Sequence, residues 1–232
     1  MKFLDFFKKI EPLFRLIEVF LIAIVTIIVS INANLIARQA NAIAEMQLDA
    51  NKEENQPNFI IDQVLEPSRQ GTENANSVLY IYNTGNTFYN PEIDIACILE
   101  LNYIDNNPAT VQYSFSIIDF YYISEMTSST DGLLRKMYHE GNWETFYNVY
   151  RASLYDNRID SGYIDLWQYV KISYDDIYGE RHTNYYIVDE IRQRLISQDA
   201  GEQAFQQYNE NLNKISVDAL SLDELLQSII EP

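Results

Sequence analysis

The apolar positions of this chain follow two different patterns, and the first is an uninterrupted run. Residues 19–37 contain no charged side chain, and the first part of this run, Val19–Ile31, is almost wholly aliphatic. Nineteen helical residues span about 28 Å, close to the ~30 Å hydrocarbon thickness of a bilayer. A soluble helix needs a polar face, and this run has none for three turns. The pattern predicts a transmembrane anchor at residues 13–37, preceded by a cytoplasmic or interfacial leader at residues 1–12.

A cleaved signal peptide is the main alternative for this segment. Small residues at the spacing of a cleavage site occur at Ala40 and Ala42. They lie about ten residues beyond the aliphatic core, whereas cleavage sites follow such a core closely. Ile31 and Leu35, which stand nearer the usual distance, are too large. We therefore expect an uncleaved signal-anchor and a single-pass membrane protein.

A polar, alanine-rich stretch follows the anchor and retains good helix formers as far as Pro57. It predicts a helical stalk over residues 38–56. Ile36 and Ile43 lie seven residues apart, and Met46 falls at the second heptad position, a spacing typical of coiled coils. The expected partners are therefore the lipid bilayer and either a protein partner or a second copy bound through the stalk. A solitary solvated helix is the alternative.

Beyond the stalk, the apolar positions alternate in a way typical of β-strands. Runs of apolar and aromatic residues separated by turn residues predict a mainly-β domain over residues 57–188. Asn83, Gly85 and Asn90 are expected to supply positive-φ positions in one turn. Two further strands are expected to form a hairpin that turns at Gly179.

Helical patterns interrupt and follow this β-region. A helical insertion is predicted at about residues 131–155, with Gly141 dividing it into two pieces. Residues 189–232 are predicted to form C-terminal helices, the last one opened by a capping box from Ser221 to Glu224. This last helix either packs on the β-domain or docks into the groove of a partner. The expected fold class is thus α+β overall.

One stretch carries a resemblance to a known architecture. The sequence IYNTGNTFYNPEIDI, residues 81–95, resembles the strand–NxGN–strand signature of immunoglobulin-like sandwich modules in bacterial cell-surface proteins. In layout, the chain also resembles bacterial single-pass membrane proteins with an anchor, a helical stalk and a small sandwich. The resemblance implies an immunoglobulin-like β-sandwich and carries over no site residues.

Charge gives an expected orientation and excludes one class of partner. The residues before Val19 carry a net charge of +1 and the remainder −19, which together make −18. Four Lys or Arg residues precede the apolar run that begins at Val19, and two follow the run nearby, which favours a cytoplasmic N-terminus and an extracytoplasmic body. The acidic body repels phosphate, so nucleic-acid binding is not expected.

The sequence holds few candidates for chemistry. Its densest polar cluster surrounds the predicted hairpin turn, and calcium accepts several close carboxylates, although the spacing matches no standard loop. The metal candidates, against a plain solvated turn, are Asp175, Asp176, Glu180 and His182.

The remaining candidates are single residues. His139 and Glu144 share a helix face only if Gly141 leaves the helix intact, and a solvated face is the alternative. Cys97, the one cysteine, lies in an apolar run, which favours a buried inert thiol. The chain shows no catalytic or cofactor motif, so we expect neither an enzyme nor a bound cofactor.

The 18 tyrosines form either a binding surface or the packing of strand faces. Three functions follow, the first being a membrane-anchored binding, accessory or scaffold protein that presents an acidic, Tyr-rich sandwich outside the membrane. The second is a cytoplasm-facing sensor or effector subunit, for example of a phage-defence system. The third is an enzyme of unrecognised type that uses His139 or His182.

Overall fold

The computed structural model describes residues 2–230 except 69–74, 105–109, 128–130 and 190–192. Contacts divide the chain into two units, residues 1–54 and 55–232, which we call the anchor unit and the body. Nearly all of the anchor unit is one helix, α1 (Lys2–Glu54).

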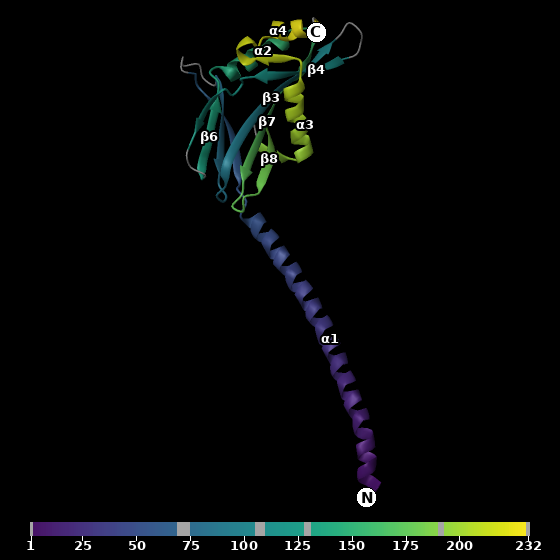
Figure 1. Ribbon diagram of the computed structural model, residues 1–232. Helices are drawn as coiled ribbons and strands as arrows, with labels where there is room; N and C mark the ends of the chain where they lie inside the picture. Colours follow the sequence, from purple (N-terminus) through teal and green to yellow (C-terminus); the bar gives the residue numbers. More distant parts are fainter. Residues whose placement is uncertain (1, 69–74, 105–109, 128–130, 190–192, 231–232) are drawn as a thin grey trace. The chain divides into compact units, whose positions relative to one another are not determined.

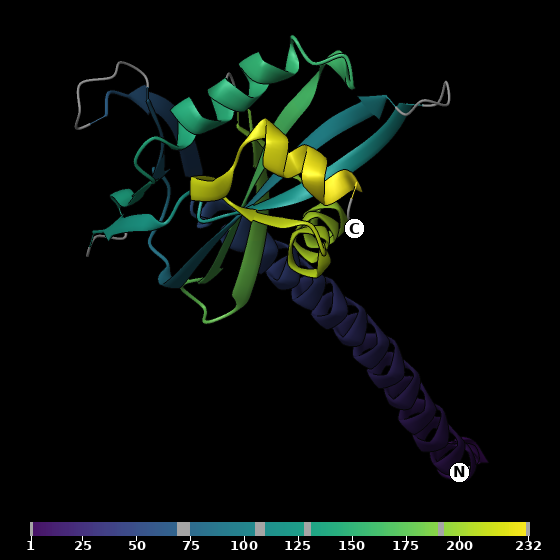
Figure 2. The same cartoon turned by 90° about the horizontal axis from the view of Figure 1, so that it is seen from above.

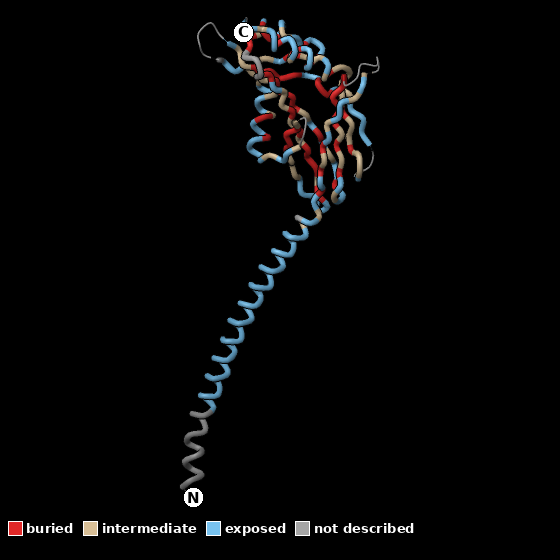
Figure 3. The backbone as a smooth tube through the Cα atoms, turned by 180° about the vertical axis from the view of Figure 1, so that it is seen from behind, coloured by how far each residue is buried: buried red, intermediate tan, exposed pale blue. Residues whose placement is uncertain are grey.

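Helix α1 combines the predicted anchor and stalk in one continuous element. Its described side chains from Arg15 to Glu45 are all exposed, and none of its apolar window is buried within the protein (Figure 3). The stretch Arg15–Lys52 is long and apolar enough to cross a membrane, which makes it a candidate span. Because it is the one such helix among the described residues, the body contributes no further candidate.

The body consists of two β-sheets (Figure 1). In the four-stranded sheet all neighbours are antiparallel, and the order is β1 (Phe59–Glu66), β2 (Asn76–Asn83), β6 (Gly132–Tyr138), β5 (Ile123–Met126). In the six-stranded sheet the order is β10 (Lys214–Ser216), β4 (Thr110–Ile118), β3 (Tyr89–Ile104), β7 (Ile159–Asp175), β8 (Arg181–Val188), β9 (Gln193–Ile196). Here only β10 runs parallel to its neighbour, β4.

The two sheets share one hydrophobic core. Phe59 of β1 makes edge-to-face contacts with Phe88 and with Tyr174 of β7, at centroid distances of 5.3 Å in both cases. Edge-to-face geometry is favoured by the aromatic quadrupole, so this cluster joins the two sheets specifically. The rest of the core comes from alternate strand positions, including Leu79, Ile81, Leu99, Leu101, Phe115, Val170 and Ile172.

Helices cover two parts of this pair of sheets. Helix α3 (Gln198–Glu210) lies along the six-stranded sheet and contacts β3, β4, β7 and β8 (Figure 1). At one end of the body, α2 (Asn142–Ser153) contacts the short 3-10 helix η1 (Val217–Ala219) and α4 (Leu222–Ile230), as Figure 2 shows from above.

The C-terminal helix packs on the body, which answers the question left open by the sequence. Leu225, Leu226 and Ile229 are buried in the common core. The predicted capping box is confirmed in part, since the Glu224 N–H donates to Ser221 Oγ at 3.2 Å. The amphipathic pattern of α4 therefore serves intramolecular packing.

The predicted helical insertion at residues 131–155 is half wrong. Residues 132–138 form strand β6, which lies between β2 and β5 and directs Leu134 and Met137 into the core. The helix begins only at Asn142, because Gly141 has φ +76°, outside the helical region. Tertiary pairing with two flanking strands has overridden the local helix propensity.

The prediction of helices alone over residues 189–232 is also wrong in part. Strands β9 and β10 both lie in this segment and extend the six-stranded sheet at its two edges. Between them α3 begins after Ser197, whose side chain accepts a hydrogen bond from the Ala200 N–H. These two short strands form the edges of the sheet, so their residues follow the pairing of strands and not a helical period.

In the NTGN stretch, residues 83–86, the role of Gly85 differs from the prediction. Gly85 has no positive φ. A glycine is needed there because a Cβ would overlap the backbone of residues 56–58. Asn83, fully buried, accepts from the N–H groups of Asn58 and Gly85 and donates to the Asn86 carbonyl. Asn90 does have a positive φ, +48°, as predicted.

Candidate functional site

The hairpin between β7 and β8 is braced by Asp176. Its Oδ1 accepts hydrogen bonds from the N–H groups of Tyr178 and Glu180, both at 2.8 Å. Its Oδ2 lies 3.0 Å from His182 Nε2, and the His182 ring stacks on Tyr174 at a centroid distance of 5.4 Å. This explains why an Asp stands where the chain reverses, since its side chain satisfies the turn's own donors.

Three of the four predicted metal ligands come together at this turn. Potential ligand atoms of Asp176, Glu180 and His182 all lie within 4.8 Å of one another. Asp175 takes no part, because it pairs with Arg181 at 3.2 Å and accepts from Asn90 at 2.7 Å. No other group of this kind lies among the residues that the structure describes.

The electrostatics of the turn keep the Asp176 carboxylate ionised. Burial of Asp176 raises the pKa of its carboxyl, but hydrogen bonds from Glu180, His182 and Tyr178 outweigh this and lower the pKa below its ordinary value of 3.8. Both carboxylate oxygens of Asp176 thus have hydrogen-bond partners within the turn, and these contacts hold its conformation.

The two other predicted chemical residues are His139, which has one carboxylate nearby, and Cys97, which is buried. His139 precedes α2 and so shares no helix face with Glu144; its Nε2 lies 3.5 Å from an exposed carboxylate, Asp218 Oδ1. Cys97 is 3% exposed, and burial raises the pKa of its thiol, as expected for an inert buried cysteine. Within the described part of the chain, neither residue forms a pair of a nucleophile and an adjacent base.

The tyrosines do not form one surface. Tyr121, Tyr174, Tyr185 and Tyr186 are buried in the body, whereas Tyr122 is 71% exposed. Tyr121 is held by its hydroxyl between Ser77 Oγ at 2.7 Å and Gln168 Oε1 at 2.5 Å. Strand packing therefore accounts for some of the tyrosines, such as Tyr174 and Tyr186. The side chain of Tyr163, another of the 18 tyrosines, lies outside the described part of the structure.

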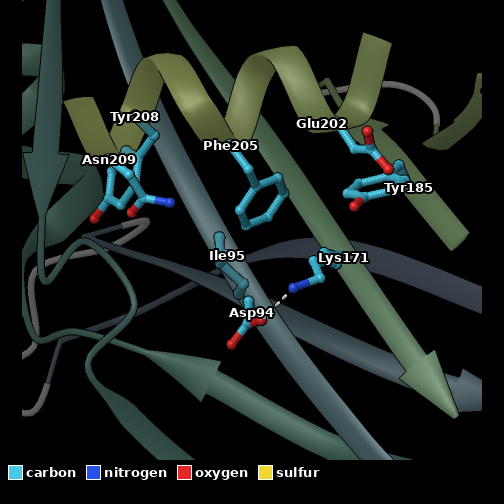
Figure 4. A pocket seen from close by; sticks show the side chains of 8 residues that line it. All are labelled: Asp94, Ile95, Lys171, Tyr185, Glu202, Phe205, Tyr208 and Asn209. Atoms are coloured by element: carbon cyan, nitrogen blue, oxygen red, sulfur yellow. Dashed lines mark hydrogen bonds and ion pairs between the residues drawn. The ribbon is translucent and has the colours of Figure 1, made fainter. Parts of the chain in front are cut away.

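A groove beside α3 is a site that the sequence did not reveal. It has a volume of about 470 Å³ and lies between α3 and strands β3, β7 and β8 (Figure 4). Three aromatic side chains line it, together with three charged groups and an amide. The lining residues are Asp94, Ile95, Lys171, Tyr185, Glu202, Phe205, Tyr208 and Asn209.

Phe205 is central to the geometry of this groove. Its ring projects from α3 toward the sheet and lies 5.8 Å from the ring of Tyr185, tilted by 59° (Figure 4). Lys171 Nζ lies 5.9 Å from the centre of the Phe205 ring and 3.2 Å from Asp94 Oδ2. The groove thus contains aromatic rings together with an ion pair between Asp94 and Lys171.

The residues that line the groove lie far apart in the sequence, so no local pattern indicated the groove. Asp94, Lys171 and Phe205 belong to three different elements, and each residue lies more than thirty positions from the next in the sequence. Tyr185 is one of the 18 tyrosines considered in the sequence, but no local pattern associated it with Phe205. No protein-family profile matches this chain, and no curated protein sequence matches it either.

Proposed function

We propose that this chain is a membrane-anchored binding protein that presents its β-rich body on the extracytoplasmic side. The observation that carries the proposal is the exposure of α1, whose aliphatic residues from Val19 to Ile31 pack against nothing in the protein. So long an exposed apolar surface is stable in lipid and costly in water.

The polar groups within the aliphatic run support the same placement. The hydroxyl of Thr26 donates to the Ile22 carbonyl and that of Ser30 donates to the Thr26 carbonyl, both at 2.8 Å. Each hydroxyl therefore has a partner within the helix, as hydrocarbon surroundings require. The excess of Lys and Arg before the anchor supports an extracytoplasmic body.

We further propose that the body is an immunoglobulin-like sandwich. The immunoglobulin strand letters A to G can be assigned in chain order to β1, β2, β3, β5, β6, β7 and β8. With these letters the four-stranded sheet has the order A-B-E-D. The six-stranded sheet then contains C, F and G as neighbours, with β4 in the place of C′. Strands β9 and β10 and the helices are additions to this scheme.

The work of such a protein is binding. Among the described residues, α3 and the sheet form an aromatic groove, and the β7–β8 turn is held by hydrogen bonds to Asp176. Neither histidine in this part of the chain lies beside a nucleophile. Self-association along Ile36, Ile43 and Met46 of α1 is part of the proposal, since all three side chains are more than half exposed.

Orientation is tested with a single introduced cysteine. Asn148→Cys places a thiol on an exposed position of α2, while buried Cys97 stays unreactive and the unmodified chain serves as the control. Labelling by a membrane-impermeant maleimide in intact cells supports the proposal. Labelling only after permeabilisation overturns it and favours the cytoplasm-facing sensor or effector instead.

The membrane anchor is tested separately by fractionation. The full chain should stay in the membrane pellet after washing with alkaline carbonate and be released by detergent. Release by carbonate alone, or loss of residues 1–42 from the mature protein, would contradict an uncleaved anchor.

A further inference from the structure

We propose that the groove between α3 and strands β3, β7 and β8 binds a neutral carbohydrate of one or two sugar rings. This inference rests on the proposed role as a binding protein and names the class of ligand. The volume of about 470 Å³ falls within the range of roughly 300–1,000 Å³ that is usual for small-molecule sites.

The aromatic lining suits the apolar side of a sugar ring. Phe205 projects into the hollow and Tyr208 lies one helical turn further along α3, so these two rings offer the accessible faces (Figure 4). Tyr185 is 6% exposed and supports the Phe205 ring from the side. The C–H groups of a pyranose ring form a flat apolar patch that packs on such faces. Stacking of this kind needs no charge on the ligand.

The polar lining suits the hydroxyl groups at the edge of the same ring. The Asp94 carboxylate accepts hydrogen bonds, the Lys171 ammonium donates them, and the Asn209 amide can do both. Asp94 and Lys171 remain 57% and 31% exposed, so each retains room for further partners beside their mutual ion pair.

The charges of the groove argue for a neutral ligand. Two carboxylates, Asp94 and Glu202, line it against one ammonium, and the body as a whole is strongly acidic, so an anion is repelled. A cation meets Lys171, which already lies over the Phe205 ring where cation–π attraction would act. A neutral polyol leaves the Asp94–Lys171 pair intact and avoids an uncompensated charge.

Binding is measured by saturation-transfer NMR and calorimetry on the full chain in nanodiscs, since maltoside detergents would supply a sugar. The probes are maltose, cellobiose, lactose and N,N′-diacetylchitobiose, with choline and inorganic phosphate as charged comparisons. At least one sugar should bind, and neither charged probe should compete with it.

Variants of Phe205 locate the site. Phe205→Ala should weaken sugar binding by roughly tenfold or more, as for a central aromatic anchor. Phe205→Tyr keeps the aromatic face and should retain binding, which separates lost stacking from lost folding. Tyr155→Ala, which removes an 86%-exposed ring away from the groove, is the matched control and should bind like the unmodified chain.

Three results would overturn the inference. They are the absence of binding by every sugar to the folded chain, an affinity unchanged by Phe205→Ala, and binding of choline or phosphate in place of sugars. These outcomes are independent of the maleimide result: outward labelling without sugar binding removes only the inference, and sugar binding without outward labelling removes only the proposed orientation.

Discussion

Gly201 of α3 lies directly against the ring of Tyr185 on β8, so closely that a Cβ at position 201 would overlap the ring. The absence of a side chain is what lets the helix approach the sheet. Because Phe205, four residues further on, forms the wall of the groove with Tyr185, this approach also sets the shape of the groove.

Gly201→Ala should therefore destabilise the body. Alanine favours a helix over glycine by about 1 kcal/mol, but overpacking against Tyr185 costs typically about 1–3 kcal/mol and opposes this gain. We expect a net loss of stability, measured by urea unfolding of the full chain in detergent.

Gln206→Ala provides the control for this prediction. Gln206 is exposed on the same helix and hydrogen-bonds only to exposed Glu210 among the contacts described. Its replacement should change the unfolding free energy by less than about 0.5 kcal/mol. If Gly201→Ala were as stable as Gln206→Ala, the close approach of helix and sheet would not be a constraint.

The brace in the β7–β8 turn should make stability depend on pH. The pKa of Asp176 is lowered in the folded protein, so the unfolded chain binds its proton more readily. The resulting stabilisation is complete above the ordinary value of 3.8 and is lost as pH falls below it. Unfolding by urea between pH 3 and pH 7 should show this loss, and Asp176→Asn should reduce the dependence.

Asp176→Ala should have a larger effect at neutral pH than Asp176→Asn. Asparagine keeps an oxygen that can accept from the Tyr178 and Glu180 N–H groups, whereas alanine leaves them without this acceptor. An unsatisfied donor costs about 1–3 kcal/mol. Equal stability of the two variants at pH 7 would contradict the bracing role.

Cys97 should resist thiol reagents in the folded protein. It is buried, and its raised thiol pKa leaves little thiolate at neutral pH. Modification by Ellman's reagent should proceed only as fast as the body opens and should become rapid in urea. Fast modification in native buffer would show that the core around β3 is accessible.

Helix α4 should contribute to the stability of the body through one face. Leu225 is fully buried, so Leu225→Ala should cost about 2–5 kcal/mol. Ile230 on the same helix is 60% exposed, so Ile230→Ala serves as a matched control and should cost little. Similar unfolding midpoints for the two variants would mean that α4 is only loosely attached.

Local sequence patterns correctly predicted those elements for which the local preference of the chain and its packing in the protein favour the same structure. The uninterrupted apolar run gave α1, the apolar stripe with its capping box gave α4, and the turn at Gly179 gave the β7–β8 hairpin. In each case the local preference and the packing environment favour the same structure. The burial of Cys97 was likewise visible in its apolar flanks.

Only the tertiary structure decided the rest. Residues 132–138 became a strand because β2 and β5 pair with them on either side, which no local propensity reports. Asp175 was separated from Asp176 because it is the last residue of β7 and pairs with Arg181 across the ladder, whereas Asp176 lies in the turn and accepts hydrogen bonds from its N–H groups. The groove exists because Gly201 lets α3 reach the sheet and brings Phe205 to Tyr185 and Lys171. Contacts between distant segments create such a site, and their energies appear in no single stretch of the chain.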